Sequence, residues 1–273
     1  MNINVLKMKS FYLILIITVT STLSLWSKDW TSWRGEDRNG ASTEKGLLQD
    51  WPEGGPKKLW VSNEAGLGYS GFTVQDGILL SMGAFDKNEY LIALNENSGK
   101  KLWEVKVGEL LTNGWGDGPR MSPTIEGKMV YALGGKGNLI CVDIKTGQKI
   151  WQKSLPKDLG GKIPGWGYTE SVLIDNGKVI CTPGGKEGAI AALDAKSGKT
   201  LWRTENFTDG AQYSSPISVV HSGQPQYIQL VMKNVVGIDP QNGSVLWKTP
   251  WAGKVAVIPT PIFSDGFVYI TSG

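Results

Sequence analysis

Histidine and cysteine are scarce in this sequence of 273 residues, which holds one histidine, His221, and two cysteines, Cys141 and Cys181. His221 lies in the segment VVHSGQPQ, which is typical of a solvent-exposed hairpin, so a Ser/His/Asp catalytic arrangement has no suitable histidine. The cysteines are not adjacent and form no CxxCH haem motif, and no Cys/His group has the spacing of a zinc site. The sequence therefore predicts no metal site.

The two cysteines fall on predicted strands of different repeat units, described below. A disulfide between them is conceivable in an exporting compartment. A free cysteine, however, is among the most buried of residues, and Cys141 stands at a position that favours a small side chain. We expect two free thiols.

A strong net charge and a long apolar run are also missing. Lys and Arg number 28 against 25 Asp and Glu, so nothing suggests nucleic acid or an anionic membrane surface as a partner. The apolar run FYLILIITV, which follows Lys7 and Lys9, is shorter than the roughly 20 residues of a membrane-spanning helix. Residues 1–24 are predicted to be a signal peptide rather than a membrane anchor. The mature chain would then be exported, periplasmic or extracellular, with no membrane span.

A twelve-residue repeat dominates the rest of the sequence, and ALDAKSGKTLWR from Ala192 to Arg203 is its clearest copy. Related copies begin at Ala93, Cys141 and Gly237, each with a small residue, an Asp or Asn two positions on, then a Gly and a Trp at fixed distances. The glycines are Gly99, Gly147, Gly198 and Gly243, and the tryptophans are Trp103, Trp151, Trp202 and Trp247. The tryptophans are 48, 51 and 45 residues apart.

Each copy is typical of two strands joined by a tight turn, in which Asp or Asn bonds the backbone and Gly adopts a positive φ. The Trp is predicted to lie over the small residue of its own copy and the glycine of the neighbouring copy, burying about 200 Å² of aromatic surface. One Trp in each unit would therefore join adjacent units.

The segment before each copy predicts two more strands, as in SPTIEGKMVYALGGKGN, where GGKGN is read as a turn and not as a phosphate-binding loop. Four strands in a unit of about 45 residues are typical of a propeller blade. No window shows a sustained helical period, which disfavours a helical solenoid. The predicted fold class is all-β, a β-propeller of four-stranded antiparallel blades.

The motif A-x-D-x-x-[ST]-G-x-x-x-W resembles the tryptophan-docking repeat of pyrroloquinoline-quinone (PQQ) type β-propellers, a family that includes quinoprotein alcohol dehydrogenases and the outer-membrane protein assembly factor. The resemblance covers residues 57–273. The opening WTSWRGEDRNGAS is similar to a further group of secreted PQQ-like propellers whose activity is mostly unassigned. Propellers of this family usually close with seven or eight blades, whereas about four and a half are counted here, so we expect the chain to be incomplete at its C-terminus.

Two further segments complete the predicted organisation. Residues 28–56 have little periodicity and are expected to form an ordered N-terminal wrap. Residues 57–61 begin with the partial copy KKLW and resemble a lone fourth strand, which in closed propellers of this type completes the last blade.

The loops that precede the innermost strands should meet at one mouth of the central channel. They bring together aromatic and ionisable side chains, namely Tyr69, Trp115, Asp117, Arg120, Trp166, Tyr168, Glu170 and Tyr213. Aromatic walls with a few polar groups are typical of a binding pocket. The alternative is that the aromatic rings only fill the channel and that the charges pair locally, for example Asp117 with Arg120.

Two functions follow from the resemblance. One is a binding or protein-interaction scaffold, with a protein or small-molecule ligand at the channel mouth. The alternative is a PQQ-dependent alcohol dehydrogenase, which the resemblance would associate with PQQ, calcium and a pair of adjacent cysteines that this sequence lacks. Because a fold does not determine chemistry, we expect the scaffold and assign no catalytic residue.

Overall fold

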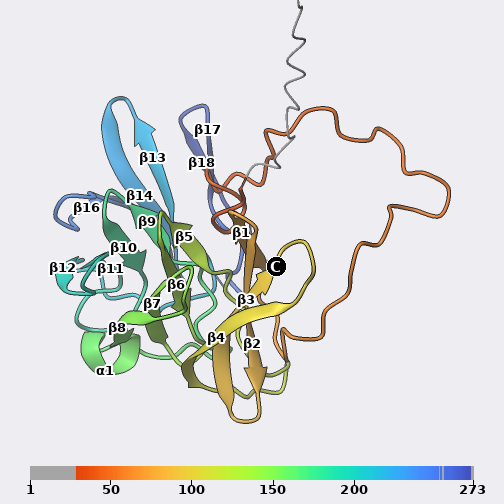
Figure 1. The fold of residues 1–273 in the computed structure, drawn as a ribbon. Helices are drawn as coiled ribbons and strands as arrows, with labels where there is room; N and C mark the ends of the chain where they lie inside the picture. The colour runs from red at the N-terminus through yellow and green to blue at the C-terminus, as the bar shows by residue number, and fades with distance from the viewer. Residues whose placement is uncertain (1–28, 252, 254, 272–273) are drawn as a thin grey trace, which may run out of the picture.

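The computed structural model describes residues 29–251, 253 and 255–271, so the predicted signal peptide lies outside the described residues. The described chain forms four four-stranded antiparallel sheets and one two-stranded sheet, each built from consecutive strands (Figure 1). The first two sheets comprise β1 (Phe72–Gln75), β2 (Ile78–Phe85), β3 (Asn88–Asn95) and β4 (Lys101–Glu109), then β5 (Thr124–Glu126), β6 (Met129–Leu133), β7 (Asn138–Asp143) and β8 (Lys149–Ser154).

The remaining elements continue the same order along the chain. The short helix α1 (Leu155–Leu159) follows β8, and Pro156 and an N-cap from Ser154 favour its start. The later sheets comprise β9 (Leu173–Asp175), β10 (Lys178–Cys181), β11 (Ala191–Asp194) and β12 (Thr200–Arg203), then β13 (Ile217–His221), β14 (Gln224–Leu230), β15 (Asn234–Ile238) and β16 (Val245–Pro250), and finally β17 (Ile262–Ser264) and β18 (Phe267–Tyr269).

The sheets are the blades of a β-propeller, as the repeats predicted. The first strand of each full sheet lies next to the first strand of the following one, so β1, β5, β9 and β13 succeed one another along the inside. The last strand of each sheet, such as β4 or β8, lies at the outside. The loops that enter the inner strands therefore lie on one side of the disc.

The repeated motif forms the hairpin between the third and fourth strands of each full blade. Its small residue stands directly opposite the Trp in the strand register, as Ala192 does with Trp202, and a bulge follows the small residue. The motif Asp accepts backbone hydrogen bonds within the turn, for example Asp194 from the amide of Ser197 at 2.8 Å. Gly198 adopts a φ of 70°, which suits glycine. The same pairing of small residue and Trp recurs at Ala93, Cys141 and Gly237.

Each of four indoles contacts the turn of the next unit. Trp151 donates from Nε1 to the carbonyl of Ala195 at 2.9 Å, and its ring lies so close to Gly198 that a Cβ there would come within 2.8 Å of it. Trp60, Trp103 and Trp202 make the same pair of contacts, with Gly99, Gly147 and Gly243. Trp247 differs, because its Nε1 bonds Gln226 of its own blade. We infer that these contacts join neighbouring blades.

Two glycines test this inference, since both have a left-handed backbone but differ in their surroundings. A Cβ on Gly177 would meet nothing within 4 Å, whereas a Cβ on Gly198 would press on the indole of Trp151. We expect Gly177→Ala to cost about 1 kcal/mol of unfolding free energy, from backbone strain alone. Gly198→Ala should cost about 1–3 kcal/mol more, because it also displaces the ring. Urea unfolding measures both, and equal costs would remove the proposed role of the glycine.

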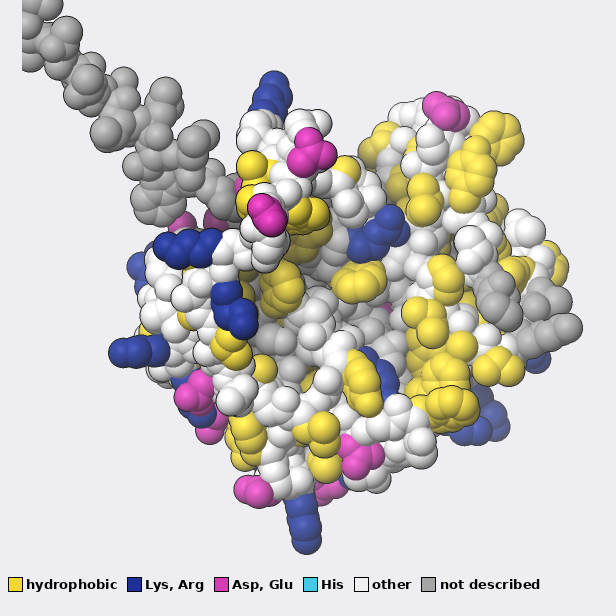
Figure 2. All heavy atoms as spheres, turned by 90° about the vertical axis from the view of Figure 1, so that its right-hand side faces the viewer, with side chains coloured by type: hydrophobic (Ala, Val, Ile, Leu, Met, Phe, Trp, Pro, Cys, Tyr) yellow, Lys and Arg dark blue, Asp and Glu magenta, His cyan; other side chains and the backbone are white. Residues whose placement is uncertain are grey.

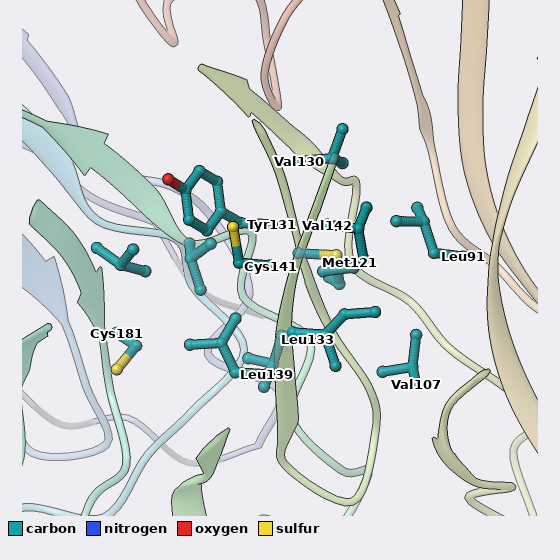
Figure 3. Close-up of a cluster of buried hydrophobic side chains, with 14 of the residues drawn as sticks. Leu91, Val107, Met121, Val130, Tyr131, Leu133, Leu139, Cys141, Val142 and Cys181 are labelled. Carbon is teal, nitrogen blue, oxygen red and sulfur yellow. The ribbon is translucent and has the colours of Figure 1, made fainter. Parts of the chain in front are cut away.

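The hydrophobic core runs between the sheets rather than within one blade. Figure 3 shows buried side chains from the first three sheets packed together, including Leu91, Tyr131 and Cys141. Cys141 and Cys181 are buried and free, as predicted, and they lie on strands of different sheets. His221 ends β13 and is exposed, also as predicted.

The fourth strand predicted at residues 57–61 is absent, because the structure assigns no strand between residue 57 and residue 61. No described strand lies beside this segment to complete a ladder. Its Trp60 nevertheless makes the indole contact with Gly99 and donates to the carbonyl of Glu96 at 2.8 Å. The indole contact of the repeat thus forms without the strand.

The N-terminal segment divides into two parts. Residues 29–40 lie across the inner strands: Trp30 exchanges backbone hydrogen bonds with Val74 of β1, and Thr31 accepts one from Ile125 of β5. Residues 41–56 are almost wholly exposed and run clear of the sheets (the orange loop in Figure 1). Among the described residues, no helix has the length and apolar character needed to span a membrane.

Candidate binding site at the channel mouth

The loops before the inner strands meet around a pocket of about 300 Å³. Five loops contribute to it, because the strands that they enter lie side by side in the propeller, and the N-terminal segment adds Trp33. The residues that line it are Trp33, Tyr69, Arg120, Trp166, Thr169, Ser171, Tyr213, Ser215, Ile258 and Thr260. A smaller adjoining depression is lined by Tyr69, Trp115, Arg120 and Trp166. The structure therefore brings together Tyr69, Trp115, Arg120, Trp166 and Tyr213 of the predicted site.

Aromatic rings form one wall of the pocket. Trp166 stacks on Tyr213 with ring centroids 5.1 Å apart and an interplanar angle of 22°, and Trp115 meets Trp166 edge-on at 6.0 Å. The phenol oxygen of Tyr213 accepts the amide hydrogen of Trp166 at 3.2 Å, which ties the two loops together. Trp115 is 77% exposed and Tyr69 is 59% exposed. Figure 2 shows one face of the molecule, on which hydrophobic side chains gather in groups beside a hollow.

Arg120 supplies the positive charge of the pocket. Its guanidinium lies 5.2 Å from the centre of the Tyr69 ring, a cation–π arrangement. It also donates to the carbonyls of Gly116 at 2.7 Å and Gly118 at 2.8 Å, which holds the loop from residue 113 to residue 120 in a tight curve. Only neutral groups accept these hydrogen bonds, so the charge is available to an anionic group of a ligand.

Asp117 lies in the same loop, and its side chain is hydrogen-bonded within that loop. Its Oδ1 accepts the amide hydrogen of Asn113 at 2.9 Å. No ion pair joins Asp117 to Arg120, although the sequence suggested one. Asp117 does not line the pocket and shapes the loop instead.

Tyr168 and Glu170 do not line the pocket either, because their side chains turn into the blade. Tyr168 is 1% exposed and donates to the carbonyl of Pro183 at 2.8 Å. Glu170 is also 1% exposed and accepts from the amide of Thr182 at 2.6 Å and from Gln229 at 3.3 Å. Burial raises the pKa of Glu170 to about 7, against the opposing effects of Thr182 and of the Arg38 charge.

The N-terminal segment supplies the buried cation beneath this region. The Arg38 guanidinium donates to the carbonyls of Ser171 and Pro216, each at 2.9 Å, and also to Val172, so it joins the third and fourth blades. Burial lowers the pKa of Arg38 to about 10, although the Glu170 charge acts in the opposite sense. Trp33 reaches across to the last described blade, where its Nε1 donates to the hydroxyl of Thr260 at 3.0 Å.

Six pocket residues were missed by the sequence prediction, namely Trp33, Thr169, Ser171, Ser215, Ile258 and Thr260. Ser171, Ser215 and Thr260 stand at equivalent places before successive inner strands, so a closer alignment of the repeats would have indicated them. The amide of Ser171 donates to the hydroxyl of Ser215 at 2.9 Å, which links adjacent blades. Trp33 carries no repeat signal, because its segment has no periodicity.

The pocket does not fit a calcium-bound quinone. Calcium takes six to eight oxygen ligands, with carboxylates prominent among them, and none of the described residues that line this pocket carries a carboxylate. Glu170 lies close by, but its oxygens face Thr182 and Gln229. In the described part of the chain, no three His, Cys, Asp or Glu side chains are grouped so as to hold a metal ion.

Four-stranded blades whose indoles lie on the turn glycines of the next unit define a β-propeller, here with an aromatic pocket among the loops that enter the inner strands. A family model described as outer membrane protein assembly factor BamB matches residues 87–273. The chain therefore belongs to this family. Its curated relatives include proteins named as assembly factors and proteins named as quinoprotein dehydrogenases.

Curated relatives match parts of the chain. Tetrathionate hydrolase of Acidithiobacillus ferrooxidans is 24% identical over 220 residues, covering 72% of this chain and 42% of that protein. The dehydrogenase subunit of the quinone alcohol dehydrogenase of Acetobacter aceti is 32% identical over 139 residues, covering 48% of this chain and 18% of that protein. BamB of Pseudomonas aeruginosa is 27% identical over 151 residues, covering 54% of this chain and 37% of that protein. The chain spans less than half the length of these relatives.

Solved structures support the fold. The quinohemoprotein alcohol dehydrogenase of Comamonas testosteroni aligns with a TM-score of 0.54 at 16% identity, covering 89% of this chain and 45% of that one. The quinohemoprotein alcohol dehydrogenase ADHIIG of Pseudomonas putida aligns with a TM-score of 0.55 at 14% identity, covering 89% of this chain and 44% of that one. At such identities the likeness concerns the propeller fold alone.

Proposed function

We propose that this chain is an exported β-propeller that binds a protein partner at its channel mouth, where an apolar or aromatic side chain of the partner enters the pocket. The observation that carries the proposal is the gathering of exposed aromatic rings with one arginine around a concave site. Tyr, Trp and Arg are the residues most enriched in binding hot spots. Exposed apolar surface of this kind is typical of an interaction site.

The chemistry of the pocket suits a peptide side chain and its backbone. The stacked pair of Trp166 and Tyr213 offers a flat apolar wall, while the hydroxyls of Ser171, Ser215 and Thr260 are close to the lining. Arg120 can meet a carbonyl or a carboxylate at the rim. The family description, an assembly factor, supports a protein partner, and the apolar run after Lys7 and Lys9 supports export.

Selection of random phage-displayed peptides on the purified chain tests the proposal. Selected peptides should share an aromatic or long aliphatic residue, and Tyr213→Ala should weaken their binding about tenfold or more, as loss of a hot-spot residue does. Leu201→Ala is the matched control, because Leu201 is 48% exposed on β12 and does not line the pocket. Equal binding by both variants, or failure to select any peptide, would contradict the proposal.

The second candidate is a PQQ-dependent alcohol dehydrogenase, favoured by the names of relatives such as the Acetobacter aceti enzyme. Against it stands the absence of a carboxylate in the pocket lining. Incubation of the chain with PQQ and calcium, followed by gel filtration and absorption spectroscopy, separates the two proposals. A quinone band that elutes with the wild-type chain and is lost in Tyr213→Ala would favour the dehydrogenase.

A further inference from the structure

A second concave site lies on the rim of the propeller, between the outer strands of the first and second blades. This rim groove has a volume of about 400 Å³ and is lined by residues of β4, β8, α1 and the turn between β6 and β7. Its lysines are Lys106 of β4, Lys136 of that turn, Lys149 of β8 and Lys157 of α1. It shares no lining residue with the pocket at the channel mouth. Any ligand of the rim groove would therefore bind independently of the proposed partner at the channel mouth.

One carboxylate stands among the four lysines. Among the described residues that line the rim groove, Glu109 is the only acidic one, and its Oε2 lies 3.0 Å from the Nζ of Lys136. The hydrogen bond from Lys136 holds the pKa of Glu109 below its usual value, and the charges of Lys106 and Lys157 act in the same sense. The rim groove thus has an excess of three positive charges, already arranged around a carboxylate.

Comparison of two repeat copies shows that the first and second blades treat an equivalent lysine differently. Lys101 and Lys149 both stand two residues after the turn glycine. Lys101 pairs with Glu104 at 2.9 Å and with Glu64 at 3.4 Å. Its pKa is raised, first by the hydrogen bond to Glu104. The first blade therefore neutralises its lysine within the chain.

Within the described part of the chain, Lys149 has no such acidic partner. Its Nζ donates to Oε1 of Gln152 at 2.8 Å and to the backbone carbonyl of Lys106 at 3.1 Å, both neutral groups. Gln152 stands where the first blade has Glu104. Burial and then the charge of Lys106 lower the pKa of Lys149. A carboxylate brought by a ligand would relieve this repulsion.

We propose that the rim groove binds an acidic segment of a protein partner, whose carboxylates lie between Lys106, Lys149 and Lys157. Ammonium groups form charge-assisted hydrogen bonds with carboxylates. Val107, Pro156 and Ile163 add apolar surface to the lining, which suits the side-chain stems of a peptide. No aromatic side chain lines the groove, so single-stranded nucleic acid would lack the rings on which its bases stack.

Fluorescence anisotropy with a labelled peptide of alternating Glu and Gly tests this proposal on the full chain at low ionic strength. The peptide should bind, a peptide with Gln in place of Glu should not, and raising the salt should weaken binding because the charges are partly exposed. The double variant Lys106→Gln/Lys149→Gln should bind about tenfold more weakly or worse, since two charge-assisted contacts are removed. Lys101→Gln should stay within about twofold of the wild type, because this lysine is neutralised and lies outside the groove.

Glu109→Gln is the control for misfolding, because a misfolded variant would bind the peptide more weakly. Glu109→Gln should instead strengthen peptide binding, since it removes the carboxylate that occupies the lysines. The proposal is overturned if the Gln peptide binds equally well, if Lys101→Gln weakens binding as much as the double variant, or if Glu109→Gln weakens it. A labelled single-stranded oligonucleotide that binds more tightly through the same lysines would also overturn it, in favour of a polyanion site.

Discussion

Replacement of Trp202 by alanine should lower the free energy of unfolding by about 3–5 kcal/mol, as removal of a large buried aromatic side chain does. Trp202 is 9% exposed, lies against Gly243 of the following turn and donates to the carbonyl of Pro240 at 3.1 Å. Its ring also stacks on Tyr227 of the next blade, with centroids 6.4 Å apart. Alanine would leave both a cavity between the blades and an unpaired carbonyl.

The cavity should not close by local collapse. The turn that Trp202 covers is held by its own backbone, since the amide of Gly243 donates to the carbonyl of Asp239 at 3.0 Å. The neighbouring Leu201→Ala is the control and should cost less than about 1 kcal/mol, because Leu201 faces solvent for 48% of its surface. Urea unfolding followed by circular dichroism measures both variants. A cost below about 1 kcal/mol for Trp202→Ala would show that the indole does not join the blades.

The fold was predictable because one side chain imposes several conditions on the sequence. An indole between two blades needs a small residue opposite it and a glycine on the next turn. In each repeat copy the small residue and the turn glycine stand at fixed distances before the Trp, so the two conditions recur with the repeat. The period between these sets then gives the size of a blade. The segment at residues 57–61 shows the limit of the pattern, because a docking Trp occurs there without the strand that its sequence predicted.

The candidate site was predictable in part. The loops before the inner strands converge, which brings Trp115, Arg120 and Tyr213 close to one another. Within one loop, however, side chains alternate in direction: Thr169 and Ser171 face the pocket, whereas Tyr168 and Glu170 face the blade. Alternation is normal for extended backbone, but the sequence does not say which set turns inward.

The contribution of Arg38, in the N-terminal segment, could not be predicted, because its side chain contacts backbone groups. Arg38 bonds three carbonyls of two blades, and such acceptors exist at every residue, whatever the side chain. A buried cation of this kind also fixes the electrostatic surroundings of Glu170. The acid–base behaviour of the interior therefore depends on a segment with no repeat pattern.

Stability should fall as the pH rises from about 4.5 to about 7, and Glu170 should account for up to about 3 kcal/mol of the loss. Its pKa is raised from 4.5 to about 7, chiefly by burial. Within this range the folded chain keeps the proton of Glu170, while the unfolded chain has lost it. The folded state therefore binds more protons, and its stability decreases with rising pH until the folded pKa is passed.

Comparison of the wild type with Glu170→Gln isolates this effect, because burial also raises the pKa of Glu89 and would contribute a pH dependence of its own. Relative to the wild type, Glu170→Gln should gain up to about 3 kcal/mol of unfolding free energy between pH 4.5 and pH 7. Above pH 7 this gain should level off. Glu53→Gln, at an exposed carboxylate, should follow the wild type throughout. Chemical unfolding at a series of pH values measures all three chains. Parallel curves for wild type and Glu170→Gln would mean that Glu170 is charged in the folded chain and that the charge of Arg38, which is also buried, compensates the burial of Glu170 in full.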